Sequence, residues 1–196
     1  MNGEASRKLI ETAALESSQL RRLTAESLSE PMIELAATIS AVIGSGGKLL
    51  IAGNGGSAGD SSHMATELIV RLTAERNRQA LPAIALSADP SIITACGNDY
   101  GFEQIFARQV QGLGKAGDIL IVISTSGNSV NLVKAAESAR ELNLLTVGLL
   151  GGDGGKLLKL CDKKLIVPHT LTQRIQEEHI FLIHLLVELI ESDLCG

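Results

Sequence analysis

The chain contains no tryptophan, and aromatic residues occupy only 2% of its 196 positions. Because 45% of the residues are nevertheless hydrophobic, the core must be built from leucine, isoleucine, valine and alanine. Charged residues make up 20%, a balance typical of globular proteins and unlike that of disordered chains. The length suits one domain, alone or with a helical extension.

A basic segment is also lacking. The formal net charge is −5, and lysine and arginine are scattered along the chain, so we predict no nucleic-acid partner. Residues 1–12 mix acidic and basic side chains and do not resemble a signal peptide. No apolar run approaches the roughly 20 residues of a membrane span, so we expect no membrane association and a cytoplasmic location.

Cysteine is sparse. Cys96, Cys161 and Cys195 are odd in number and widely spaced, and no two of them have the spacing of a metal-binding pair. Reduced thiols are the expectation for such a set in the cytosol.

Alternating patterns indicate an α/β fold. Residues 1–45 predict two helices, with a break at Ser29 and the second helix starting at Pro31. Short unbroken apolar runs follow at 48–52, 83–86, 119–123, 144–149 and 164–167. Segments of helical character separate them, including 128–142 and an apolar final helix at 173–190. This alternation predicts a parallel sheet covered on both faces.

The turn at 124–129, Ser-Thr-Ser-Gly-Asn-Ser, follows one of these runs and directly precedes a helix. The first N–H groups of a helix lack partners within it, and the helix dipole favours an anion there. The run of hydroxyl groups predicts a phosphate site that needs no cation. The alternative is a polar helix cap, which needs only one such residue.

A second strand-end turn, Gly-Asn-Gly-Gly-Ser at 53–57, is less specific. Its glycines, at 53, 55, 56 and 59, do not match the dinucleotide fingerprint, and the lysine of a P-loop is missing. A tight strand-to-helix turn that uses the conformational freedom of glycine is the alternative.

Four blocks in order resemble the sugar isomerase (SIS) domain family, most closely its phosphoheptose isomerase branch. They are the segments at 52–58, 97–102, 123–129 and 174–177. The resemblance implies a three-layer, flavodoxin-like fold with a mainly parallel five-stranded sheet. Within that fold we divide the chain into an N-terminal helical extension, 1–45, and a SIS domain, 46–196. The resemblance also implies a homotetramer that forms a heptose 7-phosphate precursor of lipopolysaccharide or other surface glycans, with active sites between subunits.

The resemblance further implies roles for particular residues. Glu67 and His184 match the family's base and acid. The positions of its zinc site are matched by His63, Glu67, Gln176 and His184. The positions that contact the sugar 7-phosphate are matched by Asn54, Gly55, Gly56, Asn98, Asp99, Ser124, Thr125, Ser126, Ser129 and Gln176.

Spacing alone is less decisive about these residues. His63 and Glu67 are four apart and share one helix face, which an ordinary exposed pair would also do. His184 sits among apolar residues, where a hydrogen-bonded core histidine is an alternative. Gln176 and His184 are about 12 Å apart along a straight helix, so Gln176 could contact substrate rather than metal.

Four other residues are candidates for supporting roles. His169 follows a proline at a strand end, where a surface loop residue is the alternative, and His179 on the apolar helix is expected to be structural. Asp60 and Ser61 could orient His63.

Two competing functions remain at the level of sequence. A non-catalytic branch of the family binds the bacterial replication initiator and resembles this chain in length and in both turns. It lacks the full histidine, glutamate and glutamine set, which favours the enzyme here. A hexulose- or arabinose-phosphate isomerase is the other alternative, although the latter usually carries regulatory domains for which this chain has no room.

Overall fold

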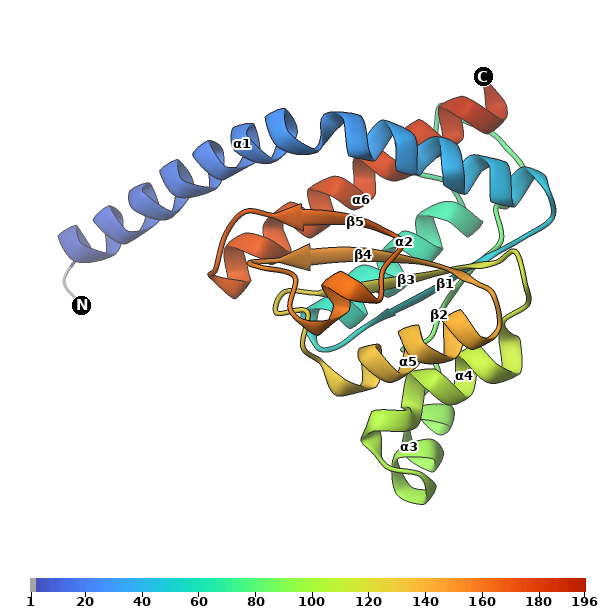
Figure 1. Cartoon of the computed structure of the whole chain (residues 1–196). Coiled ribbons are helices and arrows are strands. Elements are labelled where there is room, and N and C mark those ends of the chain that lie inside the picture. Colours follow the sequence, from blue (N-terminus) through green and yellow to red (C-terminus); the bar gives the residue numbers. More distant parts are fainter. Residues whose placement is uncertain (1–2) are drawn as a thin grey trace.

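The computed structural model describes residues 3–196 (Figure 1). Its centre is a parallel sheet of five strands in the order β2-β1-β3-β4-β5. The strands are β1 (Leu49–Gly53), β2 (Ala83–Ala85), β3 (Ile119–Ser124), β4 (Leu145–Gly151) and β5 (Lys163–Val167). The predicted α/β class is thus confirmed, and each apolar run lies within a residue or two of a strand.

Helices cover both faces of the sheet. They are α1 (Gly3–Gly44), α2 (Gly56–Ile69), α3 (Pro90–Asp99), α4 (Ile105–Leu113), α5 (Val130–Glu141) and α6 (Thr172–Cys195), with short 3-10 turns η1 (Phe102–Gln104) and η2 (Lys156–Lys159). Successive strand residues point to opposite faces. Leu49 and Ile51 therefore pack with α1, α2 and α6, whereas Leu50 and Ala52 pack with α4 and α5.

The predicted break in the N-terminal segment is wrong, because α1 runs without interruption through Pro31. Proline removes one backbone hydrogen bond from a helix, so the sequence alone favours a break there. Leu28, Met32 and Leu35 lie on both sides of it and are buried. Their packing beside α6 outweighs the lost bond (Figure 1).

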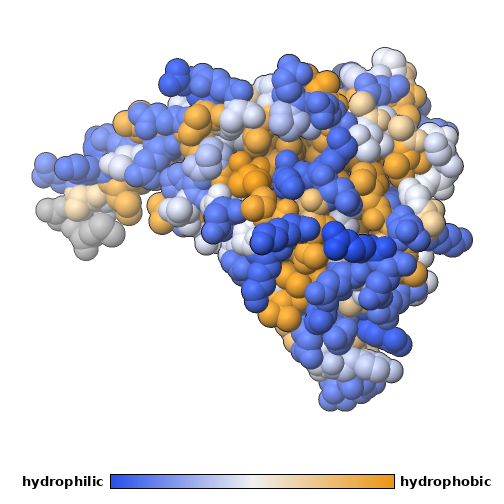
Figure 2. All heavy atoms as spheres, viewed as in Figure 1, coloured by the Kyte–Doolittle hydropathy of each residue, from blue (hydrophilic) through white to orange (hydrophobic). Residues whose placement is uncertain are grey.

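The first turns of α1 extend beyond the body of the molecule (Figure 1). Leu9, Ile10 and Leu15 on this part are exposed. Figure 2 shows such apolar side chains interspersed with charged ones on the face in view. None of the helices within residues 3–196 combines the length and apolar character that a membrane crossing requires. The three cysteines are free thiols, and burial raises the pKa of Cys161 to about 12.

Candidate active site

The two turns singled out in the sequence lie at the carboxyl ends of adjacent strands, β1 and β3. Strand order changes direction between these strands, since β2 lies beyond β1 while β4 lies beyond β3. Ligands of open parallel sheets bind at such a switch point. The fold therefore brings both turns to the place where a substrate is expected.

The turn at 124–129 is held by its own polar groups. Ser124 Oγ accepts a hydrogen bond from Gly127 N at 3.1 Å, and Ser126 Oγ accepts one from Asn128 N at 3.2 Å. Gly127 has a φ of 63°, and a Cβ there would lie 1.9 Å from the Gly154 carbonyl oxygen. Only glycine therefore lets this turn pack against the loop after β4.

Ser129 is the N-cap residue of α5, yet its side chain makes no capping hydrogen bond. The simple capping explanation of this turn therefore fails for Ser129. Its hydroxyl group and that of half-buried Thr125 stand beside the start of α5, where the helix dipole favours an anion. These donors leave the phosphate prediction for this turn open to test.

The glycine turn is joined to α5 by a pair of amides. Asn54 Nδ2 donates to Asn131 Oδ1 at 2.9 Å, and Asn131 Nδ2 donates to Asn54 Oδ1 at 2.8 Å. Sequence reasoning missed Asn131, which is only 3% exposed. The sequence did offer one signal for Asn131, an amide side chain at the second position of a helix. Its partner Asn54 lies 77 positions away, so the pairing could not be read from the sequence.

Gln176, in the first turns of α6, lies against the start of α2. A Cβ on Gly56 would come within 2.6 Å of Gln176 Nε2. Absence of a side chain at Gly56 therefore makes room for this amide beside the glycine turn.

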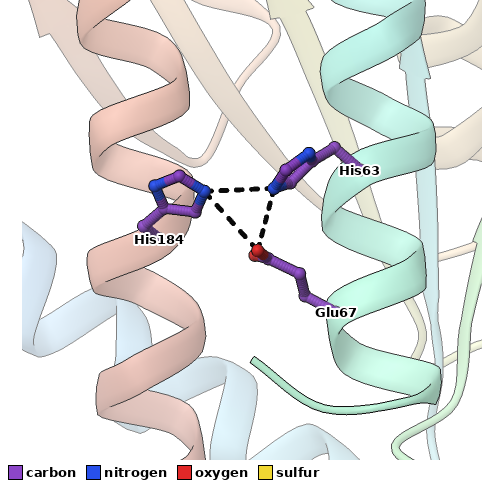
Figure 3. A group of neighbouring side chains, drawn as sticks. All are labelled: His63, Glu67 and His184. Atoms are coloured by element: carbon purple, nitrogen blue, oxygen red, sulfur yellow. Dashed lines mark hydrogen bonds and ion pairs between the residues drawn. The ribbon is translucent and has the colours of Figure 1, made fainter. Parts of the chain in front are cut away.

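Three side chains from two helices converge on one point (Figure 3). His63 and Glu67 extend from α2, and His184 extends from α6. His63 Nε2 lies 2.8 Å from Glu67 Oε1 and 3.0 Å from His184 Nε2, and His184 Nε2 lies 3.5 Å from Glu67 Oε1. The His184 side chain is 46% exposed, so the alternative of a core histidine is wrong.

The donor set of this cluster suits a divalent cation. All three ligand atoms lie within 4.8 Å of one another. Two imidazole nitrogens at hydrogen-bond distance can share only one proton, and Glu67 Oε2 is buried without a partner among residues 3–196. Imidazole and carboxylate groups are zinc ligands, and a bound cation would satisfy the lone pairs that the protein leaves unpaired.

Asn98 and Asp99 occupy the end of α3 and are exposed. Asn98 Nδ2 donates to Asp99 Oδ1 at 2.8 Å, and within the described part of the chain no hydrogen bond joins either residue to the two turns. A separate cavity of about 490 Å³ is lined by Asn54, Phe102, Glu103, Ser129, Val130 and Asn131. It joins a residue of each turn to the η1 segment.

Two further histidines, His179 and His169, make contacts outside this cluster. His179 is fully buried, its Nε2 lies 3.1 Å from the Leu150 carbonyl oxygen, and burial lowers its pKa to about 4. Its expected structural role agrees with this. His169 is half-buried, and its Nδ1 accepts a hydrogen bond from Leu171 N.

The suggestion that Asp60 or Ser61 orients His63 finds no support in the contacts. Ser61 Oγ donates to the Ser57 carbonyl oxygen at 2.8 Å, within its own helix. Burial raises the pKa of Asp60, an effect that His63 opposes, but no hydrogen bond between Asp60 and His63 occurs among residues 3–196.

Comparison with known proteins shows the family to which the chain belongs. Residues 15–151, more than half of the chain, match the family model of the SIS domain. The chain therefore belongs to the SIS domain family, the class that its sheet and its two strand-end turns define.

Relatives narrow the class further. A phosphoheptose isomerase of Trichlorobacter lovleyi is 54% identical over 169 residues, which cover 86% of this chain and 85% of the relative. One from Helicobacter hepaticus is 56% identical over 151 residues, covering 77% and 76%. Within the SIS domain family, the chain belongs to the phosphoheptose isomerases, a family of sugar-phosphate isomerases, as its motifs predicted.

Two solved structures of phosphoheptose isomerases have the same fold as this chain. The phosphoheptose isomerase of Francisella tularensis superimposes with a TM-score of 0.92 at 39% identity, and that of Neisseria gonorrhoeae with 0.89 at 40%. Each comparison covers 95% of this chain and 98% of the other.

Proposed function

We propose that this protein interconverts sedoheptulose 7-phosphate and D-glycero-D-manno-heptose 7-phosphate through an enediol. The observation that carries the proposal is the approach of Glu67 on α2 to His184 on α6, 3.5 Å apart between Oε1 and Nε2. The predicted acid and base thus come from two separate helices, α2 and α6, and meet at one point. Two relatives that are 54% and 56% identical to this chain are named phosphoheptose isomerase.

Substrate binding in this proposal starts at the phosphate. Ser124, Thr125, Ser126 and Ser129 surround it with hydroxyl and backbone donors at the start of α5, as their positions in the family motif imply. The sugar chain then extends over the glycine turn, with Asn54, Gly55, Gly56 and Gln176 beside it. Asn98 and Asp99 reach the sugar only if the segment around α3 or a second subunit brings them there.

Proton transfer is assigned to the two residues that approach each other. Glu67 removes a proton from the carbon next to the carbonyl, and the resulting electron pair forms the enediol. His184 supplies a proton to the carbonyl oxygen in that step and takes a hydroxyl proton back in the next. The carbon that carried the carbonyl group is then protonated by Glu67, which restores both groups and completes the isomerisation.

His63, Glu67 and His184 would hold zinc, with Gln176 as a further candidate ligand. A bound zinc ion supplies polarisation of the substrate carbonyl and stabilises the negative charge that develops on its oxygen. Glu67 is assigned both as ligand and base, and His184 both as ligand and acid, as their positions in the family motif imply; Glu67 Oε1 is the oxygen that contacts the histidines.

The finer context is also proposed here. A homotetramer with sites between subunits, a cytoplasmic location and a role in lipopolysaccharide or surface-glycan synthesis follow from the family resemblance. The exposed apolar residues of α1 suit such an assembly. The division between an extension at 1–45 and a domain at 46–196 stays a prediction.

The direct test is conversion of sedoheptulose 7-phosphate by the purified protein, with and without added zinc, followed by product NMR. Formation of the heptose 7-phosphate supports the proposal. No conversion under either condition overturns it and favours the non-catalytic alternative, which predicts binding of the bacterial replication initiator instead.

A further inference from the structure

We propose that the buried ion pair of Arg78 and Glu191 is a positioning device, which sets the distance between the two helices that carry Glu67 and His184. The inference rests on the proposed function. Neither residue belongs to the sequence motifs, and Arg78 lies in the connection between α2 and β2.

Arg78 holds the carboxyl end of α2. Its Nη2 donates to the Glu67 carbonyl oxygen at 2.7 Å, and its Nη1 donates to the Leu68 carbonyl oxygen at 2.8 Å. The last carbonyl groups of a helix lack partners within the helix, and a cation there also complements the helix dipole. The guanidinium group thus fixes the backbone of the predicted base itself.

The same guanidinium group is fixed to α6. Arg78 Nε donates to Glu191 Oε1 at 2.8 Å, and Nη2 lies 2.7 Å from the same oxygen. The side chains of Arg78 and Glu191 are 2% and 1% exposed. Glu191 lies seven residues after His184, about two helical turns along the same face of α6.

This geometry connects the base and the acid through the ends of their helices. The cluster of Figure 3 requires α2 and α6 to keep their spacing, and a misplacement of about 1 Å can cost about a hundredfold in rate. A buried ion pair adds little net stability compared with apolar packing, but its geometry is demanding. Its value here is the fixed register of the two helices.

Arg76 provides a matched control. It lies 4.0 Å from Glu191 Oε2 and donates to the Glu188 carbonyl oxygen and to Ser192 Oγ. All these partners belong to α6, so Arg76 shares the carboxylate with Arg78 but holds no carbonyl group of α2.

The experiment compares Arg78→Lys and Arg76→Met with the wild type, using kcat, KM and the zinc affinity measured by competition with a chromophoric chelator. Lysine keeps the charge opposite Glu191 but cannot reach both carbonyl groups and the carboxylate with fixed geometry. We expect Arg78→Lys to lower kcat about tenfold or more and to weaken zinc binding about tenfold, with KM changed less than about twofold. Arg76→Met should change none of these.

Two results overturn the inference: a folded Arg78→Lys enzyme with wild-type kcat and zinc affinity, or an equal loss in Arg76→Met. If Arg78→Lys does not fold, Glu191→Gln replaces it with the same expected losses, because an amide has one neutral acceptor oxygen in place of the charged carboxylate that fixes Arg78. If the wild type converts no heptose phosphate, the proposed function fails by itself. In that case the zinc affinities still test the positioning device: weaker zinc binding by Arg78→Lys than by Arg76→Met supports it, and equal affinities contradict it.

Discussion

Asn54 and Asn131 exchange two amide hydrogen bonds, at 2.9 and 2.8 Å, and thereby join the turn after β1 to the first turn of α5. The glycine turn and the serine turn are for this reason parts of one rigid site. In the proposed binding mode, this link would set the distance between the phosphate at α5 and the start of α2. Loss of this link should therefore affect substrate binding.

Asn131→Ala tests that link. The change leaves the Asn54 amide without its partner, which costs about 1–3 kcal/mol of stability when the group stays buried. We expect KM to rise about tenfold, because Asn54 turns away from the substrate. Steady-state kinetics measure it, with Ser138→Ala as the control, another buried polar side chain of α5. An unchanged KM would show that the two turns bind substrate independently.

Glu67→Gln should lower kcat at least about a hundredfold, because an amide cannot accept the substrate proton. Substrate affinity and oligomeric state should stay close to those of the wild type. Calorimetric binding of the heptose phosphate and light scattering measure both. Glu188→Gln, on the exposed face of α6, is the control. Loss of folding in Glu67→Gln would instead indicate a structural role.

Ser129→Ala separates substrate binding from helix capping. Because the Ser129 side chain makes no capping bond, the free energy of unfolding should change by less than about 0.5 kcal/mol. Loss of a hydrogen bond to a charged phosphate should raise KM about tenfold or more. Denaturant unfolding and kinetics check the two parts. Wild-type KM would exclude this hydroxyl group from the phosphate site.

Gly56→Ala should displace Gln176, since the added methyl group would lie 2.6 Å from its Nε2. The amide is the end of a flexible side chain, so stability should hardly fall while KM rises. Gly59→Ala is the matched control, because a Cβ there meets nothing within 4 Å. Equal kinetics for both variants would mean that Gln176 does not contact substrate.

His179 makes stability depend on pH. Burial lowers its pKa in the folded protein from 6.5 to about 4, so the unfolded chain takes up a proton first as the pH falls. The stability due to neutral His179 is complete above about pH 6.5 and is lost toward pH 4, by about 3 kcal/mol. Urea unfolding between pH 7 and 4.5 should show a steeper loss for the wild type than for His179→Gln. Parallel curves would contradict this assignment.

The strands were predictable because a strand of a covered parallel sheet is buried on both faces and shows an unbroken apolar run. The run at 119–123 coincides with β3 except for Ser124. Pro31 misled the prediction because its effect is local, whereas the buried residues around it pack against α6, more than 140 positions later in the chain.

The candidate site divides in the same way. The serine and glycine turns are contiguous in sequence and follow apolar runs, so their place at the sheet edge could be read directly. Asn131 and Arg78 could not be found in this way, because Asn131 binds Asn54, 77 positions away, and Arg78 binds Glu191, 113 positions away.

The sequence by itself determined the parallel sheet, the two strand-end turns and the family, because these depend on short-range patterns of apolar, glycine and hydroxyl residues. Only the tertiary structure decided that His184 faces His63 and Glu67 rather than the core. The rotation of α6 about its axis depends on the packing of the whole helix against α1 and α2, and no local pattern specifies it.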